Sequence, residues 1–341
     1  MNKTKIAFFD IKDYEREYLL HCKPDGCEFI LLGYNLQDNF DINIEKVKDV
    51  EILSIFTDSR VTPEYISKFP NLKIICTRST GFSHIDTDYC AKNNIAVVNV
   101  PRYGDCTVAE FSYGLLLDVA RKINMAYQDL QRGVINTQKY IGIDLYGKTI
   151  GIIGTGAIGS NSVRIASGFG MKILAFDPYP NQELIKTYNV EYVSLDELLA
   201  NSDIINLHAP STKENFHMIN DESFKKMKKR VIVINTARGE IIDTVALYHA
   251  LKDGIVGGAG LDVVECEEIL GHEDVYLSKI DCVKPDCLAK TLLNHKLLEL
   301  PNVVVTPHIA FDTKEAVKRI LQTTVLNINS YIEGRIINRV N

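Results

Sequence analysis

Short runs of aliphatic and β-branched residues alternate with helical patterns along the first hundred residues. Between two such runs, Thr62-Pro63-Glu64 offers an N-cap, a proline at the first helical position and an early acidic residue, which predicts a helix over Pro63–Phe69. Alternating strands and helices are typical of parallel βαβ units. The apolar runs predict strands at Lys5–Phe9, Phe29–Leu32, Glu51–Phe56, Leu72–Thr77 and Ile95–Val100.

The pattern changes after Pro101. The stretch Thr107–Gln131 is long and amphipathic and predicts a helix that crosses between two domains, so we place a domain boundary near residue 101. A second βα series begins at Lys148 and is also predicted to be doubly wound. Its strands are predicted at Thr149–Ile153, Lys172–Phe176, Asp203–Leu207, Val231–Asn235, Ala259–Val263 and Val303–Thr306.

The last helical pattern, from Thr313 to Tyr331, follows the final strand of the second series. We expect this helix to return to the first domain, which would then be built from both ends of the chain. The expected domains are residues 1–101 with 309–341, and residues 102–308. A cleft between the two domains is the expected site.

Composition narrows the possible partners. The chain has 341 residues, of which 46% are hydrophobic, and this is enough for two globular domains. Acidic residues outnumber basic ones 44 to 38, so no overall field would attract nucleic acid or an anionic membrane. The basic run from Lys225 to Arg230 is interpreted as a solvated helix end before a buried strand rather than as a nucleic-acid patch.

The start of the chain has too few consecutive apolar residues for a signal peptide, and no run of eighteen apolar residues follows. We therefore expect a soluble, cytoplasmic protein. The eight cysteines are expected to be reduced thiols, most of them ordinary core residues, rather than a disulfide framework.

A glycine-rich turn predicts a dinucleotide site. Gly154-Thr155-Gly156-Ala157-Ile158-Gly159 follows an apolar strand and opens a helix, which is the context that this fingerprint requires. Gly154 permits the tight turn, Gly156 lets a pyrophosphate approach the backbone, and Gly159 lets the helix pack on the strand.

An acidic residue strengthens this interpretation. Asp177 ends the next predicted strand, 18 residues past Gly159, where a carboxylate grips the adenosine ribose hydroxyls. Its charge would repel a 2′-phosphate, and Pro178 and Tyr179 offer no arginine to bind one. NAD is therefore favoured over NADP.

Hydride transfer to a 2-oxo acid requires a cation to fix the carboxylate and polarise the ketone, and an acid to protonate the alkoxide. Arg238 and His308 each follow a predicted strand and could fill these roles. Glu267 could hold the His308 imidazole protonated near neutrality, because a nearby carboxylate favours the charged form. From composition alone, Glu265 is an equal candidate.

Taken together, these segments resemble the D-isomer-specific 2-hydroxy acid dehydrogenase family over nearly the whole chain. In that family the arginine and the glutamate lie 29 residues apart, and this spacing selects Glu267 over Glu265. The matching segments are Arg78–Gly81, Tyr103–Glu110, Gly154–Gly159, His208–Pro210, Asn235–Gly239, Gly260–Glu267 and Thr306–Phe311.

The resemblance implies that Arg238 binds and polarises the substrate, that His308 donates the proton in the reductive direction, and that Glu267 pairs with His308. The backbone amides of Thr80 and Gly81 would hold the substrate carboxylate. A homodimer joined through the cofactor domains is also implied. The implied NAD contacts are Ala157, Ile158, Asp177, Ala209, Pro210, Asn215, Thr236, Ala237 and Asp262.

Within the family, Tyr103 and the run His308–Phe311 look most like the D-lactate dehydrogenase branch, in which Tyr103 and Phe311 would line the substrate pocket. Reduction of pyruvate to D-lactate is the expected reaction. A dehydrogenase of a branched, aromatic or phosphorylated 2-hydroxy acid is an alternative. So is an NAD-sensing binding protein like the C-terminal-binding-protein corepressors, which resemble the same family.

One departure from the family is the spacing of 41 residues between Glu267 and His308. We interpret it as an insertion near the cleft. We expect no metal there, because the cysteines and histidines within it lack a paired ligand pattern. These residues are His272, Cys282, Cys287 and His295.

The expected fold is α/β, with two doubly wound parallel-sheet domains. One is a Rossmann cofactor domain and the other a flavodoxin-like, discontinuous substrate domain.

Overall fold

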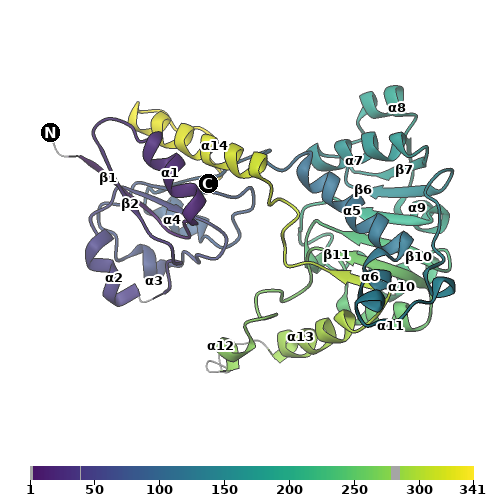
Figure 1. Ribbon diagram of the computed structural model, residues 1–341. Coiled ribbons are helices and arrows are strands. Elements are labelled where there is room, and N and C mark those ends of the chain that lie inside the picture. Colours follow the sequence, from purple (N-terminus) through teal and green to yellow (C-terminus); the bar gives the residue numbers. More distant parts are fainter. Residues whose placement is uncertain (1–2, 39, 278–284) are drawn as a thin grey trace. The chain divides into compact units, whose positions relative to one another are not determined.

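The computed structural model describes residues 3–38, 40–277 and 285–341. These residues form two compact units, which Figure 1 shows by their sequence colours. Unit 1 comprises Met1–Tyr103 with Thr313–Asn341, and unit 2 comprises Gly104–Asp312. Each unit is built on one sheet whose described strand pairs are all parallel.

The sheet of unit 1 has the order β2-β1-β3-β4-β5, which is the doubly wound order of flavodoxin-like domains. Its strands are β1 (Thr4–Phe8), β2 (Cys27–Leu31), β3 (Ile52–Ile55), β4 (Ile74–Thr77) and β5 (Ala96–Val98). Its helices are α1 (Asp13–His21), α2 (Phe40–Val47), α3 (Pro63–Ile66), α4 (Thr87–Lys92) and α14 (Lys314–Ile332).

Helix α14 belongs to unit 1 although it comes from the other end of the chain. It contacts α1 and β4, and Figure 1 shows it running beside α1. Leu321 and Ile328 of this helix are buried with Ile6 and Phe8 of β1 on one face of the sheet. The helix begins at Thr313, whose hydroxyl accepts a hydrogen bond from the amide of Ala316 at 3.1 Å.

The sheet of unit 2 has the order β12-β11-β10-β9-β6-β7-β8, which is the Rossmann order with one additional strand. Its strands are β6 (Thr149–Ile153), β7 (Lys172–Phe176), β8 (Glu191–Tyr192), β9 (Ile204–Leu207), β10 (Val231–Asn235), β11 (Val256–Leu261) and β12 (Val303–Val305). Its helices are α5 (Thr107–Arg121), α6 (Ile123–Gln131), α7 (Ala157–Gly168), α8 (Gln182–Tyr188), α9 (Leu195–Asn201), α10 (Asp221–Lys226), α11 (Thr244–Lys252), α12 (Glu273–Leu277) and α13 (Pro285–Leu298), with 3₁₀ turns η1 (Thr137–Tyr140) and η2 (Gly239–Ile241).

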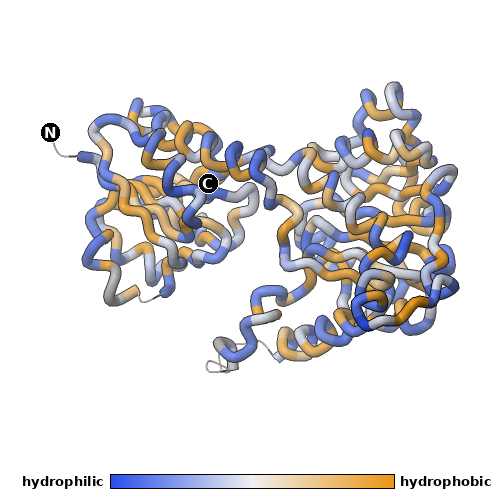
Figure 2. The backbone as a smooth tube through the Cα atoms, viewed as in Figure 1, coloured by the Kyte–Doolittle hydropathy of each residue, from blue (hydrophilic) through white to orange (hydrophobic). Residues whose placement is uncertain are grey.

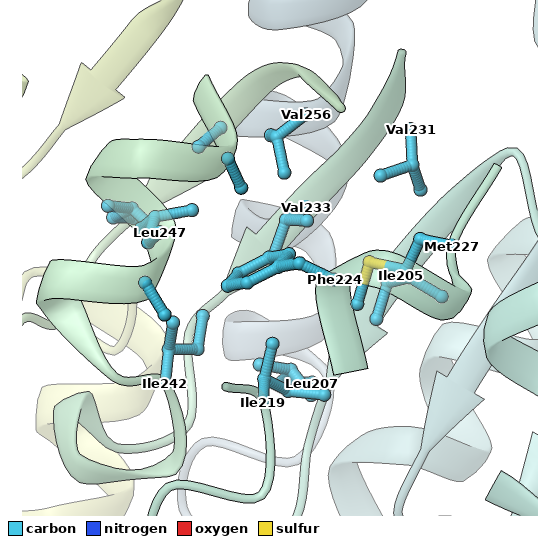
Figure 3. Packing of buried hydrophobic residues seen from close by; sticks show 14 of the residues in the cluster. Ile205, Leu207, Ile219, Phe224, Met227, Val231, Val233, Ile242, Leu247 and Val256 are labelled. Atoms are coloured by element: carbon cyan, nitrogen blue, oxygen red, sulfur yellow. The ribbon is translucent and has the colours of Figure 1, made fainter. Parts of the chain in front are cut away.

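Both sheets are covered on both faces, so the residues of their central strands are mostly apolar and buried. Figure 2 shows this as hydrophobic strands at the centre of unit 1. In unit 2 the ring of Phe224 from α10 packs among aliphatic side chains that include Val233 of β10 and Ile219 (Figure 3). The predicted fold class of two doubly wound parallel sheets is confirmed.

The expected helix over Thr107–Gln131 is wrong in two respects. It is two helices, α5 and α6, because Lys122 between them adopts a left-handed φ of 55°. In addition, α5 does not cross between domains: it packs on β10, β11 and α7 within unit 2. The apolar pattern of the sequence does not indicate strand β8, which has only two residues.

The expectation that all eight cysteines are reduced is wrong for one pair. Cys266 and Cys287 form a disulfide, with their Cα atoms 5.5 Å apart. Sequence spacing could not show this, because α13 is what returns Cys287 to Cys266. Cys282 lies outside the described residues. The other cysteines are free thiols: Cys22, Cys27, Cys76, Cys90 and Cys106.

Among the described helices, none combines the length and the apolar character that a bilayer crossing requires.

Candidate active site

The glycine turn lies between β6 and α7 in unit 2, and two of its glycines have no room for a side chain. A Cβ on Gly154, whose φ is +89°, would lie 2.8 Å from the amide nitrogen of Ala209. A Cβ on Gly159 would lie 1.9 Å from the carbonyl oxygen of Gly154. A Cβ on Gly156, by contrast, would meet nothing within 4 Å. Gly154 and Gly159 therefore shape the turn, while Gly156 leaves its backbone open to a ligand.

Asp177 follows β7 and is tied to the same turn. Its Oδ2 accepts hydrogen bonds from the Thr155 amide at 2.7 Å and the Thr155 hydroxyl at 3.1 Å, and its Oδ1 accepts one from the Tyr179 amide at 2.8 Å. The hydroxyl of Tyr192 on β8 donates to Thr155 Oγ1 at 2.9 Å. The structure thus brings the predicted carboxylate to the glycine turn and adds Thr155 as an anchor that the glycine motif does not indicate.

The segment after β9 runs beside the glycine turn. The two ring nitrogens of His208 are buried, and neither has a hydrogen-bond partner among the described residues. Burial lowers its pKa to about 3, so its ring is neutral. Asn215 closes the loop that follows, since its amide donates to Pro210 O at 2.6 Å and its Oδ1 accepts from Thr212 N at 2.7 Å. The loop that presents Ala209 and Pro210 is therefore held by Asn215.

Arg238 lies in a turn after β10. The buried Asn235 shapes this turn, because its Oδ1 accepts from the amide of Ala237 at 3.0 Å and its Nδ2 donates to Arg238 O at 2.9 Å. Gly239 follows, and a Cβ there would lie 2.3 Å from Val264 O. The turn that exposes Arg238 is thus pressed directly against the segment after β11. The guanidinium of Arg238 donates to Ala237 O at 2.6 Å.

Asp262, at the end of β11, organises the turn that carries His308. Its carboxylate is buried and accepts hydrogen bonds from Thr306 Oγ1 at 2.6 Å, Ile309 N at 2.9 Å and Ala310 N at 2.8 Å. His308 has a left-handed φ of 53°, which is uncommon for a residue other than glycine. The three hydrogen bonds of Asp262 hold this backbone in place.

His308 and Glu267 form an ion pair. The imidazole Nδ1 lies 2.7 Å from Glu267 Oε1, and the His308 side chain is 43% exposed. Burial and the charge of Arg238 lower the pKa of His308. The hydrogen bond and charge of Glu267, together with the charge of Asp262, raise the pKa by more than this. The pKa therefore lies above its ordinary value, and Nε2 is left to act on a ligand.

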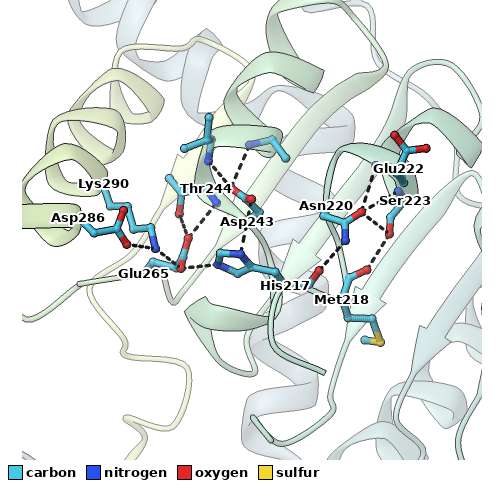
Figure 4. A network of polar contacts seen from close by, with 12 residues as sticks. His217, Met218, Asn220, Glu222, Ser223, Asp243, Thr244, Glu265, Asp286 and Lys290 are labelled. Carbon is cyan, nitrogen blue, oxygen red and sulfur yellow. Dashed lines mark hydrogen bonds and ion pairs between the residues drawn. The ribbon is translucent and has the colours of Figure 1, made fainter. Parts of the chain in front are cut away.

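Glu265 occupies a different environment from Glu267, although only one residue separates them. It is 3% exposed, and Figure 4 shows its carboxylate between His217, Lys290 and Thr244. Oε1 accepts hydrogen bonds from His217 Nε2 at 2.7 Å and Lys290 Nζ at 2.9 Å, and Oε2 accepts two from Thr244. The carboxylate that meets His308 is thus Glu267, while Glu265 is committed to the interior. No spacing in the sequence indicated the roles of Lys290 and His217.

Thr80, Gly81 and Tyr103 belong to unit 1. Thr80 Oγ1 donates to Val100 O at 2.9 Å, and Thr80 O accepts from Asn99 Nδ2 at 2.8 Å, so both groups are occupied. Among the described residues, the amides of Thr80 and Gly81 donate no hydrogen bond. The carbonyl of Tyr103 accepts from Arg319 Nε of α14 at 2.8 Å. Phe311 lies in unit 2, three residues after His308, and is half-buried.

The residues of unit 2 fit the expected NAD. The backbone at Gly156 is open, and α7 begins directly after it, so its first amides offer donors to a phosphate. The buried hydroxyl of Thr236, beyond β10, has no partner among the described residues. A buried polar group of this kind is usually satisfied by a ligand or water.

Comparison with known proteins leads to the same family. Residues 113–310 match the family model of the D-isomer specific 2-hydroxyacid dehydrogenase, NAD binding domain. The chain is 36% identical to the D-lactate dehydrogenase of Escherichia coli over 334 residues, which cover 97% of each chain. It is 38% identical to an aromatic 2-oxoacid reductase of Clostridium sporogenes over 300 residues, which cover 87% of each.

A solved structure agrees with these relatives. It is the D-lactate dehydrogenase of Aquifex aeolicus complexed with NAD and lactic acid, which matches with a TM-score of 0.83 and 35% identity over 96% of both chains. One family is therefore supported by the fold, by the site geometry and by similarity over nearly the full length of the chain. The chain belongs to the D-isomer-specific 2-hydroxyacid dehydrogenases, and it is an NAD-dependent oxidoreductase.

Proposed function

We propose that this enzyme reduces a small 2-oxo acid, foremost pyruvate, to the D-2-hydroxy acid. The observation that carries the proposal is the pairing of His308 Nδ1 with Glu267 Oε1 at 2.7 Å, which favours the protonated imidazole and leaves its Nε2 available to a ligand. An acid of this kind is what the new alkoxide requires.

The substrate is bound by Arg238 and by two backbone amides, and it is protonated by His308. Arg238 binds the carboxylate and polarises the ketone, since a guanidinium offers paired donors to such oxygens. The amides of Thr80 and Gly81 are proposed as further donors to the carboxylate. When NADH is bound, it supplies the hydride. His308 then gives its Nε2 proton to the oxygen, and Glu267 stabilises the imidazolium before the transfer.

The proposed cofactor contacts are those described above in unit 2. Asp177 accepts from the ribose hydroxyls, and the amides at the start of α7 bind the pyrophosphate. The residues proposed to contact NAD are Gly154, Gly156, Ala157, Ile158, Gly159, Asp177, Ala209, Pro210, Asn215, Thr236, Ala237 and Asp262.

The proposal of a small, unphosphorylated substrate rests on Tyr103 and Phe311 and on the burial of Arg78. The guanidinium of Arg78 donates to Phe9 O at 2.7 Å, to Asp10 O at 3.0 Å and to Ser54 Oγ at 3.2 Å. Because its side chain is 1% exposed, it has no surface to offer a substrate phosphate. It positions the start of the segment that leads to Thr80.

The test is a panel of NADH oxidation rates with pyruvate, 2-oxoisocaproate, phenylpyruvate, glyoxylate and 3-phosphohydroxypyruvate, compared by kcat/KM. We expect pyruvate to give the highest value. Preference for phenylpyruvate would place the enzyme with the aromatic 2-oxoacid reductases, and preference for the phosphorylated acid would overturn the proposed pocket. NADH binding without turnover of any of these acids would instead indicate an NAD-dependent binding protein.

We further propose that the enzyme is a homodimer through unit 2. Large apolar side chains are more than half exposed along α6 and the segment after it, and clusters of this kind mark protein interfaces. Light scattering on a size-exclusion column should give twice the mass of 38.4 kDa, and a monomer would contradict the proposal. The exposed side chains are Ile123, Tyr127, Leu130, Ile135, Ile141 and Tyr146.

A further inference from the structure

Helix α13 holds both residues that precede Glu267. Lys290 Nζ donates to Glu265 Oε1 at 2.9 Å, and Asn294 Nδ2 donates to the carbonyl of Glu265 at 2.9 Å. Cys287 forms the disulfide with Cys266. Positions 287, 290 and 294 recur at three and four residues, so they lie on one face of the helix.

The segment held in this way is a sharp turn. Cys266 has a left-handed φ of 56°, a conformation that L residues adopt only when their surroundings impose it. Glu267 follows directly, and its carboxylate contacts His308 Nδ1 at 2.7 Å and the amide of Val264, three residues earlier, at 3.2 Å. The direction of the Glu267 side chain therefore depends on the turn that Glu265 and Cys266 define.

We propose that Lys290 and the disulfide between Cys266 and Cys287 are positioning elements that hold Glu267 against His308. This inference rests on the proposed function, in which the pair of Glu267 and His308 supplies the proton. Lys290 touches neither residue of the pair and acts only through Glu265 and the turn.

The ammonium of Lys290 compensates the negative charge of the buried Glu265 carboxylate. Its side chain is 11% exposed and lies between Glu265 and Asp286, with Nζ 2.7 Å from Asp286 Oδ2. Without it, the buried Glu265 carboxylate would keep His217 and Thr244 but lose its permanent cation. Removing one partner of a buried ion pair is costly, so the turn is expected to shift toward water.

The consequence appears in the pH dependence of the reaction. The charged groups that face His308 are Glu267, Asp262 and Arg238. If Glu267 moves away, the imidazolium loses its nearest anion, and reduction fails at a lower pH than in the unaltered enzyme. A change in stability alone would leave this pH unchanged.

The first experiment compares Lys290→Met with Lys296→Met. Lys296 lies on the same helix but pairs with the exposed Glu299, so it is a matched control. We expect the alkaline limb of kcat/KM for pyruvate reduction to move down by about 0.5–1 pH unit in Lys290→Met, which is the loss of part of one charged hydrogen bond. Lys296→Met should not move it, Lys290→Arg should restore it, and the NADH Kd should not change.

The main arm of the second experiment uses the unaltered enzyme and so avoids any failure of a variant to fold; two cysteine variants serve as its controls. A dithiol such as dithiothreitol opens the disulfide by exchange: the bond between the cysteine sulfurs breaks, both cysteines become thiols, and the reagent is oxidised to its cyclic disulfide. Thiol titration follows the opening. We expect the alkaline limb to move down in the unaltered enzyme and in Cys22→Ser. Cys287→Ser should have the lowered limb with or without the reagent.

The outcomes separate this inference from the proposed function. An unmoved limb in folded Lys290→Met, or after complete reduction of the disulfide, overturns the positioning role while His308 remains the acid. Full turnover by His308→Gln overturns the proposed function itself.

Discussion

The glycine turn after β6 and the turn after β11 follow strands of the same parallel sheet, but different forces shape them. The first is shaped by the backbone, since Gly154 and Gly159 have no space for a Cβ atom. The second is shaped by side chains, namely the buried carboxylate of Glu265, the ammonium of Lys290 and the disulfide of Cys266. The cofactor turn should therefore respond to side-chain bulk, and the catalytic turn to charge.

The largest effect should come from removing His308, the acid that pairs with Glu267 of the catalytic turn. His308→Gln keeps a hydrogen-bonding side chain, but its amide is not acidic enough to transfer a proton to the substrate oxygen. We expect kcat to fall by roughly 10²–10⁴-fold, because general acid catalysis contributes about this much. The NADH Kd, measured by fluorescence, should stay within about twofold, since only the transition state requires the proton. Turnover close to that of the unaltered enzyme would assign the acid to another group.

A methyl group added to the cofactor turn tests whether this turn responds to side-chain bulk. In Gly156→Ala the new Cβ meets nothing in the protein, so thermal stability should hardly change. Its methyl group would stand where the pyrophosphate approaches, and overpacking of ~1–3 kcal/mol corresponds to about 5–150-fold weaker NADH binding.

Two further glycines calibrate this result. Gly159→Ala should lower the melting temperature, because its Cβ would overlap the carbonyl of Gly154. Gly168→Ala, on the same helix with nothing within 4 Å, should change neither stability nor NADH binding appreciably. If Gly156→Ala binds NADH normally, the pyrophosphate does not lie at this turn.

A smaller effect is expected from Asp177→Ser. Loss of the repulsion of a 2′-phosphate should narrow the preference for NADH over NADPH by about tenfold, or ~1.4 kcal/mol. Asp177 also anchors Thr155, so some loss of NADH binding should accompany the change. Thr155→Val is the control, because it loosens the anchor and keeps the charge. An unchanged ratio of the two kcat/KM values in Asp177→Ser would remove the ribose role from Asp177.

The sequence predicts the two regions unequally well. Local signals determine the glycine turn, so β6, β7 and Asp177 could all be placed from motif and spacing. The break between α5 and α6 at Lys122 could not be predicted, because nothing in the local sequence marks a lysine that adopts a left-handed φ. The partners of Glu265 are far apart in the chain, and only tertiary packing brings them together. His217 lies in the segment before α10, Thr244 begins α11, and Lys290 lies on α13.

The disulfide shows the same limit. Cys266 and Cys287 are 21 residues apart, and nothing in that spacing distinguishes a bonded pair from two thiols. Choosing between Glu265 and Glu267 from the residues alone was equally impossible, because both are acidic and both follow β11. Resemblance selected Glu267, and the structure places it 2.7 Å from the His308 imidazole.

The most direct test of the central claim, that Glu267 keeps His308 protonated, is the pH dependence of kcat/KM for pyruvate reduction in Glu267→Gln. Reduction requires the imidazolium, so activity is present below the pKa of His308 and lost above it. Glu267 raises that pKa by its hydrogen bond and its charge. In Glu267→Gln we expect the alkaline limb to move down by about one pH unit, the equivalent of ~1.4 kcal/mol, with NADH binding unchanged. An alkaline limb at the same pH in the variant and the unaltered enzyme would contradict the claim.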